Sequence, residues 1–413
     1  MTPRFGALRI PAYRRYFALG LMSMVADNIE HVISYWVLFQ VFHSPALAGF
    51  AVISHWVPFL LFSLYAGALA DRKDCRRLIQ ISQALFMVAS TSWGILFLTG
   101  TLQMWHAVVI LTVHGFAGVI GTPASQLLIH DMVPREELPS AIRLNASSRY
   151  LAILLGPAIG GGLMLLLGPS WGILANVLIF LPFSIFIRRT PYTGHLKTPV
   201  GARRSLGLVD VMSTFAIART RRGITTMIVL AGASSFFVGN AFQAQMPEYA
   251  QHLGADTTGA LYSVLLAANA AGAVLGVVLL EIAGTLRPGV RAAIVCAALS
   301  GVTMGLFPMT SSYPQAVALL VVAGVFTIGF QSMAQTLVQM LAPPAARGTI
   351  VGLFNTAMLG LRAGSGVTVG VLGTFIGIRL SLEISSLAVV LISLALLARE
   401  VTVGQRVGAK RAS

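Results

Sequence analysis

Residues 67–78 read Gly67-Ala-Leu-Ala-Asp-Arg-Lys-Asp-Cys-Arg-Arg-Leu78, a short basic segment between two long apolar runs. Those runs, at about 45–70 and 77–99, each exceed the roughly 20 apolar residues that a helix needs to cross a bilayer. Basic loops between spans stay on the cytoplasmic side of a membrane. We therefore predict two membrane-spanning helices joined by a tight cytoplasmic loop.

The rest of the chain repeats this pattern of apolar runs. Of the 413 residues, 56% are hydrophobic and 10% are charged, whereas a soluble domain carries about 25% charged residues. The mean hydropathy is +0.82, so lipid is the expected solvent. We predict an all-α membrane protein with twelve spanning helices. They are expected at about 16–42, 45–70, 77–99, 104–131, 142–167, 170–188, 223–247, 257–282, 291–310, 314–341, 348–376 and 379–399.

The formal net charge of +15 follows from the predicted topology. Lys and Arg residues gather before the first span, in alternate loops and after the last span, whereas the opposite side carries only Arg379. This asymmetry places both termini in the cytoplasm, in a bacterial inner membrane. Because the basic residues then contact anionic headgroups, we expect the lipid bilayer as a partner and no nucleic acid.

A polar, basic segment at 189–222 divides the chain into two halves of six predicted helices. We predict an N-terminal bundle at 1–188, a cytoplasmic linker at 189–222, and a C-terminal bundle with a short basic tail at 223–413. Residues of the first half recur in the second at a constant offset. These are Pro134, Asn145, Gly156 and Gly160, matched by Pro344, Asn355, Gly366 and Gly370. Parallel repeats of this kind are typical of transporters that hold substrate near the bilayer midplane.

The segment at 67–78 resembles the signature G-x-L-A-D-R-x-G-R-R/K of the major facilitator superfamily, which lies between its second and third helices. The resemblance implies two pseudo-symmetric six-helix bundles, alternating access and a monomer. It also implies a gating motif made of Gly67, Asp71, Arg72 and Arg76, in which the glycine permits close helix approach. The sequence departs from the pattern at Asp74, where the family usually has glycine.

The expected fifth helix contains Gly156-Pro157-Ala-Ile-Gly160-Gly161-Gly162. This run resembles the G-P-x-x-G-G motif of the exporter branch, and its alternative explanation is generic tight packing of small residues. Residues 123–145 are also similar to the subgroup of enterobactin-type siderophore exporters and drug-efflux proteins. Both resemblances imply export. The acids within the first predicted helix, and not the resemblances, predict that a proton gradient drives it, with no other cofactor.

The first predicted helix carries Asp27, Glu30 and His31 on one face. Ionisable groups inside a membrane are costly and usually functional, so we predict that these three residues bind protons or substrate. Pairing of the acids with Arg149 or Arg362, which also fall within spans, is the structural alternative. Arg362 has a second alternative role, the recognition of an anionic substrate.

Histidines His55 and His114 are expected near His31, because the helices that carry them are neighbours in this architecture. Together with the acids they have the donor atoms for a divalent metal. No His-x-x-x-His or His-x-x-x-Asp pair lies on one helix, so we predict no metal site. Polar residues that either face the cavity or link helices are Asn28, His55, His114, Asn240, Gln243, Gln331, Gln335 and Asn355.

No P-loop, G-x-S-x-G or H-E-x-x-H motif occurs, so no enzymatic activity is expected. The main hypothesis is proton-coupled export of a small organic molecule, either a drug-like compound or a siderophore. Two alternatives use the same fold: a lipid or lysolipid translocator and a divalent metal exporter. A membrane scaffold or sensor would be marked by a sizeable soluble domain, which the sequence does not predict.

Overall fold

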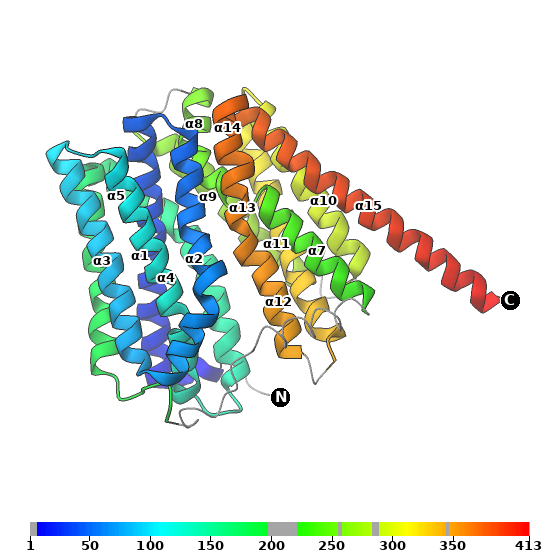
Figure 1. The fold of residues 1–413 in the computed structure, drawn as a ribbon, viewed down its shortest axis with the longest axis horizontal. Coiled ribbons are helices and arrows are strands. Elements are labelled where there is room, and N and C mark those ends of the chain that lie inside the picture. The colour runs from blue at the N-terminus through cyan, green and yellow to red at the C-terminus, as the bar shows by residue number, and fades with distance from the viewer. Residues whose placement is uncertain (1–5, 197–220, 255–257, 283–288, 344–346, 413) are drawn as a thin grey trace. The chain divides into compact units, whose positions relative to one another are not determined.

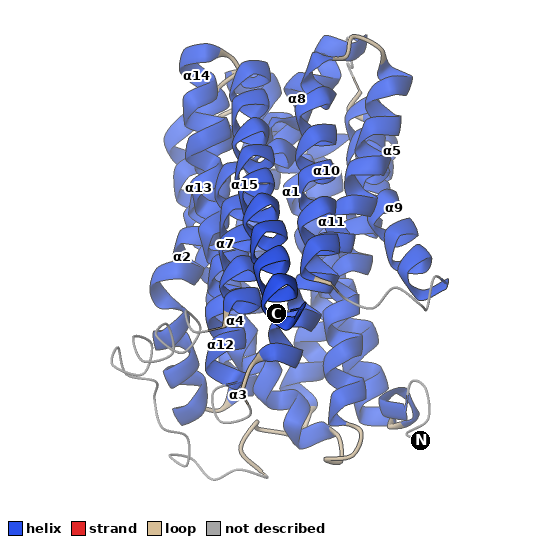
Figure 2. Ribbon diagram, turned by 90° about the vertical axis from the view of Figure 1, so that its right-hand side faces the viewer, coloured by secondary structure: helices blue, strands red, loops and turns tan. Residues whose placement is uncertain are grey.

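The computed structural model describes residues 6–196, 221–254, 258–282, 289–343 and 347–412. Figure 2 shows that the regular elements within these ranges are all helices. The prediction of an all-α protein is therefore confirmed for the described part of the chain.

The first half contains η1 (Gly6–Arg9), α1 (Pro11–Phe42), α2 (Pro45–Arg72), α3 (Cys75–Thr99), α4 (Met104–Met132) and α5 (Leu138–Arg189) (Figure 1). Individual residues determine where some of these helices begin and end. Pro11 opens α1 at a position where its missing N–H is not needed. Gly100 ends α3 with a φ of 64°, in the left-handed region that glycine adopts without steric cost.

The helix α5 contains two predicted spans, 142–167 and 170–188. They meet at Gly168, whose φ of 73° and ψ of 165° are not helical. Pro169 follows and fixes its own φ near the helical value. The two spans are therefore separate helical segments joined at a glycine.

The second half contains α7 (Arg222–Phe237), α8 (Ala241–Gly254), α9 (Ala260–Ile282), α10 (Val290–Leu306), η2 (Phe307–Met309), α11 (Tyr313–Leu341), α12 (Arg347–Leu359), η4 (Gly360–Arg362), α13 (Ala363–Ser365), the π-helix η5 (Gly366–Val371), α14 (Leu372–Ile376) and α15 (Ile378–Ala412). Two predicted spans are thus interrupted. The span at 223–247 breaks at Gly239, which has a φ of 44°. The span at 348–376 passes through 3₁₀ and π turns.

Nine stretches of the described residues are long and apolar enough to cross a membrane. One of them, Leu151–Arg189, holds both the fifth and the sixth predicted spans. The first predicted span corresponds to α1, whose apolar run is interrupted by acids, and the eighth to the shorter apolar helix within α9. Among the described residues, each of the twelve predicted spans therefore contains helix.

Residue contacts group the chain into two compact units. The first comprises 1–43, 54–205 and 256–267, and the second comprises 44–53, 206–255 and 268–413. The predicted boundary between the two bundles remains a prediction, because residues 197–220 of the linker lie outside the described residues.

Each unit has its own buried core. In the first, α1 packs along α5, and α3 packs along α4 and α5. In the second, α10 packs against α11 and α15, and α7 packs against α12. These contacts bury one side of α1 and set the positions of its polar residues.

Candidate functional site

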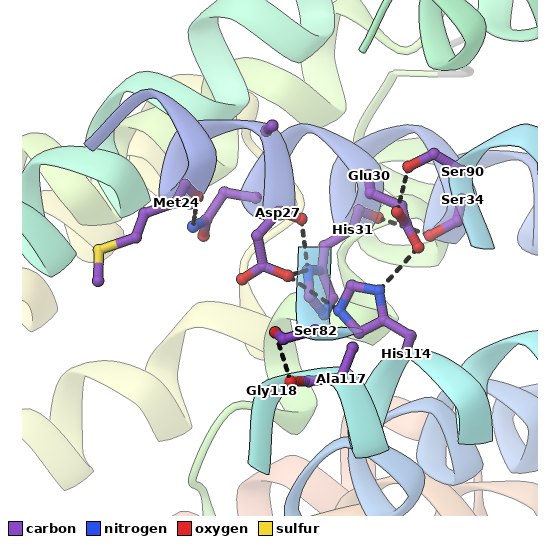
Figure 3. A network of polar contacts seen from close by, with 12 residues as sticks. Met24, Asp27, Glu30, His31, Ser34, Ser82, Ser90, His114, Ala117 and Gly118 are labelled. Carbon is purple, nitrogen blue, oxygen red and sulfur yellow. Dashed lines mark hydrogen bonds and ion pairs between the residues drawn. The ribbon is translucent and has the colours of Figure 1, made fainter. Parts of the chain in front are cut away.

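The polar face of α1 meets α4 inside the first unit. Figure 3 shows Asp27, Glu30 and His31 on α1 directed toward His114 on α4. Residues 27, 30, 31 and 34 share one helical face because an α-helix has 3.6 residues per turn. The face predicted from the sequence is therefore the face that contacts another ionisable group.

His114 lies between the two carboxylates. Its Nε2 is 2.9 Å from Asp27 Oδ1, and its Nδ1 is 2.8 Å from Glu30 Oε1. The contact with Glu30 is a hydrogen bond, and the contact with Asp27 lies within ion-pair distance, so a protonated imidazole would carry the opposite charge to both carboxylates. Gain or loss of one proton changes the charge of this cluster by one unit.

The two carboxylate side chains differ in how much of their surface is exposed. Glu30 keeps 3% of its side chain exposed, and the Ser90 hydroxyl donates a hydrogen bond to it. Asp27 keeps 27% of its side chain exposed. Water can therefore reach Asp27 more readily than Glu30, which is held on both oxygens by protein groups.

The three histidines converge from three helices. The ring centroid of His31 is 4.7 Å from that of His114 and 5.0 Å from that of His55, and the His55 and His114 centroids are 5.6 Å apart. On α1 itself, His31 Nδ1 is 3.8 Å from Asp27 Oδ1, four residues earlier. The sequence prediction did not include this Asp-x-x-x-His pair, because it was based on His-x-x-x-His and His-x-x-x-Asp pairs, in which histidine comes first.

The two arginines within spans are not the ion-pair partners found for the acids of α1. Asp27 pairs with His114 and His31, and Glu30 pairs with His114. Arg149 is half-buried on α5. The Nε of Arg362, in the second unit, donates to the Met358 carbonyl at 3.2 Å. Within the first unit the acids of α1 therefore pair with histidines, whereas pairing with Arg362 of the second unit stays a prediction.

In the loop between α2 and α3, Asp74 stands where the family usually has glycine. Its side chain caps α3 by accepting from the Arg76 backbone N–H at 2.9 Å, and Arg76 Nη2 lies 2.7 Å from Asp74 Oδ2. Arg76 Nη1 also donates to the Thr190 carbonyl at 3.0 Å. The departure from the family pattern thus supplies a helix cap and an ion pair.

The other members of the predicted gating motif differ in exposure. Arg72 is exposed and Asp71 is half-buried. A methyl group added at Gly67 would meet no described atom within 4 Å. The close helix approach expected at Gly67 is therefore not observed among the described residues, and the gating role of the motif stays a prediction.

An Asp74→Ala substitution tests the cap. Burial raises the pKa of the Asp74 carboxyl, but hydrogen bonds from Arg76 outweigh it and hold that pKa below its ordinary value of 3.8. Loss of the cap should lower the free energy of unfolding by about 1 kcal/mol at pH 7. Because the pKa is lower in the folded state, the ion-pair contribution is complete above pH 3.8 and is lost as the pH falls through the folded value.

Thermal unfolding in detergent at several pH values measures this effect. An Asp74→Asn variant is the matched control, because asparagine caps a helix but carries no charge. It should unfold between the wild type and Asp74→Ala at pH 7. Equal stability of all three proteins would contradict the assignment.

The glycine motif of α5 is a packing surface. A Cβ added at Gly156 would lie 2.4 Å from the Cβ of Asn28, and one at Gly160 would lie 3.3 Å from the Cβ of Val32, both on α1. A Cβ at Gly161 would lie 2.5 Å from the Ser263 hydroxyl on α9. The motif therefore brings α5 close to α1 at the residue next to Asp27, whereas a role in export remains a prediction. Pro157 is buried inside α5.

A Gly156→Leu substitution should force α1 and α5 apart, because no space exists for a side chain beside Asn28. Overpacking of this kind costs about 1–3 kcal/mol, so we expect a lower unfolding temperature and a loss of transport. The control is Gly162→Leu, six residues along the same helix, where an added Cβ meets no described atom within 4 Å. If both variants unfold like the wild type, the close contact is not present in the protein.

Some of the amide side chains form hydrogen bonds with other protein groups, and others are exposed. Asn28 Nδ2 donates to the Met24 carbonyl at 2.8 Å, and Asn240 Nδ2 donates to Gln243 Oε1 at 3.2 Å. Gln331 is half-buried, whereas Gln335 and Asn355 are exposed. Two amides link helices: Gln245 Nε2 donates to the Pro45 carbonyl, and Asn176 Nδ2, which the prediction omitted, donates to the Ala26 carbonyl. Residue type alone does not separate an amide that links helices from one that is exposed.

Residues 16–366 match the sequence model of the Major Facilitator Superfamily. The chain belongs to this superfamily. It is 20% identical over 224 residues to the staphyloferrin A transporter of Staphylococcus aureus, a match that covers 54% of this chain and 56% of that protein. It is 25% identical over 169 residues to the proposed multidrug resistance protein MdtD of Escherichia coli, covering 38% of this chain and 35% of that protein. The chain thus spans about half or less of the length of these relatives.

Solved structures of this superfamily share the fold over nearly the whole chain. A bacterial homologue of the human lysosomal transporter Spinster has a TM-score of 0.70 at 13% identity, covering 94% of this chain and 96% of its own. The nucleoside transporter NupG has a TM-score of 0.71 at 13% identity, covering 94% and 98%. The predicted architecture of a major facilitator transporter is therefore confirmed.

Proposed function

We propose that this major facilitator protein is a proton-coupled exporter of a small organic molecule that works by alternating access. We place it as a monomer in a bacterial inner membrane, with both termini in the cytoplasm and the proton gradient as its energy source. The observation that carries the proposal is His114, held between Asp27 and Glu30 inside the first unit.

The cluster has the properties that a proton carrier needs. Charges inside a membrane cost several kcal/mol and persist where they are functional or paired. Here two carboxylates meet one imidazole, so one bound proton decides whether the group is balanced. We assign the exchangeable proton to Asp27, which is the more exposed acid, and a positioning role to Glu30, which Ser90 and His114 hold in place.

Coupling follows if the two conformations of the transporter bind this proton with different affinity. A proton can shift a conformational equilibrium only by its differential affinity for the two states. Substrate that prefers the deprotonated state would then displace the proton, and the gradient would drive substrate outward.

The class of substrate is supported by the relatives and by exposed amides. One relative is named for staphyloferrin A and another for multidrug resistance. Gln335 and Asn355 expose amides on helices of the second unit, and amides orient substrates of varied charge through hydrogen bonds. A drug-like compound or a siderophore fits both observations, whereas a lipid translocator is the alternative outcome.

Proteoliposomes with an imposed pH gradient and an internal pH-sensitive dye test the proposal. Lipophilic drugs and metal-free siderophores are added one at a time. We expect at least one compound to elicit a proton flux that empty liposomes do not show. Translocation of a fluorescent lipid without any compound-dependent proton flux would instead support the lipid translocator and contradict proton-coupled export.

A further inference from the structure

The three histidines form a group of donor atoms on three separate helices. One ring nitrogen from each of His31, His55 and His114 lies within 4.8 Å of the others. Bonds of about 2.1 Å from nitrogen to a tetrahedral Zn²⁺ place the ligand atoms about 3.4 Å apart. The three nitrogen atoms would therefore have to approach one another when a metal ion binds.

The contacts behind these rings match the surroundings of metal-bound histidines. A metal-ligating imidazole almost always bonds through its other nitrogen to a carboxylate or a backbone carbonyl, which fixes the tautomer. His114 Nδ1 contacts Glu30 at 2.8 Å, and His31 Nδ1 contacts the Asp27 carbonyl at 2.8 Å. This leaves Nε2 of His31 for another ligand, while Nε2 of His114 faces Asp27 Oδ1 at 2.9 Å.

Two further observations complete the donor set. The Nδ1 atom of His55 is buried, and among the described residues it has no hydrogen-bond partner, which is costly unless another group satisfies it. Asp27 Oδ1 lies 2.9 Å from His114 Nε2 and 3.8 Å from His31 Nδ1, and its side chain is 27% exposed. It offers a carboxylate ligand on the open side of the group.

We propose that His31, His55 and His114, with Asp27 as a fourth ligand, bind one divalent transition metal ion of the Zn²⁺ and Co²⁺ class. Imidazole nitrogen suits these borderline ions, whereas Mg²⁺ and Ca²⁺ require oxygen ligands. The ion's two positive charges balance the carboxylates of Asp27 and Glu30. The earlier expectation of no metal site rested on pairs within one helix, and these ligands come from α1, α2 and α4.

The proposal goes beyond the proposed transport function and does not depend on it. Metal binding is a property of the purified protein without substrate, membrane potential or gradient. The ion would replace the proton between His114 Nε2 and Asp27, so metal and proton occupy the group alternately. A protein that binds metal but does not export organic compounds, or the reverse, would separate the two proposals.

Cobalt titration of the full-length protein in detergent, with any polyhistidine tag removed, tests the site. Four-coordinate Co²⁺ absorbs visible light far more strongly than the hydrated ion. We expect one equivalent of Co²⁺ to produce this absorption and one equivalent of Zn²⁺ to remove it by competition. Absence of saturable binding of either ion by a protein with the thermal stability of the folded state would overturn the proposal.

The variants are chosen to leave the fold intact. His55→Phe keeps a ring that packs against Trp56 and Phe59 and should weaken metal binding by more than about 100-fold. Glu30→Gln alters a positioning contact and should weaken it about 10- to 100-fold. His252→Gln, at an exposed histidine of α8, should bind like the wild type. Equal Co²⁺ affinity in His55→Phe and the wild type would place the metal elsewhere and contradict the assignment.

Discussion

A His114→Leu substitution should lower the free energy of unfolding by about 3–5 kcal/mol, because it leaves two buried or partly buried carboxylates facing each other without the imidazole between them. Leucine is apolar and close in volume to histidine, so the loss reflects charge more than packing. Thermal or denaturant unfolding in detergent at pH 7 measures it.

A triple variant separates the charge effect from a packing effect. Combining His114→Leu with Asp27→Asn and Glu30→Gln removes both negative charges, and replacement of a whole buried ionic group is often nearly neutral for stability. We expect the triple variant to regain most of the lost stability. If it is as unstable as His114→Leu alone, the imidazole matters for packing and the charge network is not its main role.

An Asp27→Asn substitution should reduce gradient-driven transport to the level measured without a gradient. Asparagine has nearly the shape of aspartate but binds no exchangeable proton near neutral pH. Substrate exchange across the membrane at equal pH requires no net proton movement and should continue. Transport in proteoliposomes, with and without an imposed pH gradient, gives both rates.

The matched control is Glu248→Gln, which removes a carboxylate from α8 in the second unit. It should keep its response to the gradient. An Asp27→Asn protein that responds to the gradient as the wild type does would show that another group carries the coupling proton.

The spans were predictable because apolar length is a strong signal, and Asp27, Glu30 and His31 were predictable because helical periodicity places them on one face. The breaks within the spans could not be predicted from the sequence. Gly239 and Gly168 interrupt apolar runs, and many other glycines of this chain lie in unbroken helix. Only the neighbouring backbone distinguishes a glycine that bends the chain from one that admits a packed helix.

The partners of the site residues were harder to predict than the residues themselves. The alternative prediction paired Asp27 with Arg149 or Arg362, whereas the contact with His114 depends on which face of α4 meets α1. Asp74 looked like a defect in a family motif, and its value as a cap and ion-pair partner of Arg76 depends on where α3 begins. Both outcomes depend on tertiary geometry that residue spacing does not contain.

Proton release on substrate binding measures whether Asp27 carries the coupling proton. A compound identified in proteoliposomes is added to the purified protein in weakly buffered detergent solution with a soluble pH indicator, at a pH where Asp27 exchanges its proton. We expect the wild type to release a proton on binding and Asp27→Asn to bind the compound without releasing one. Equal proton release from both proteins would contradict the assignment of the coupling proton to Asp27.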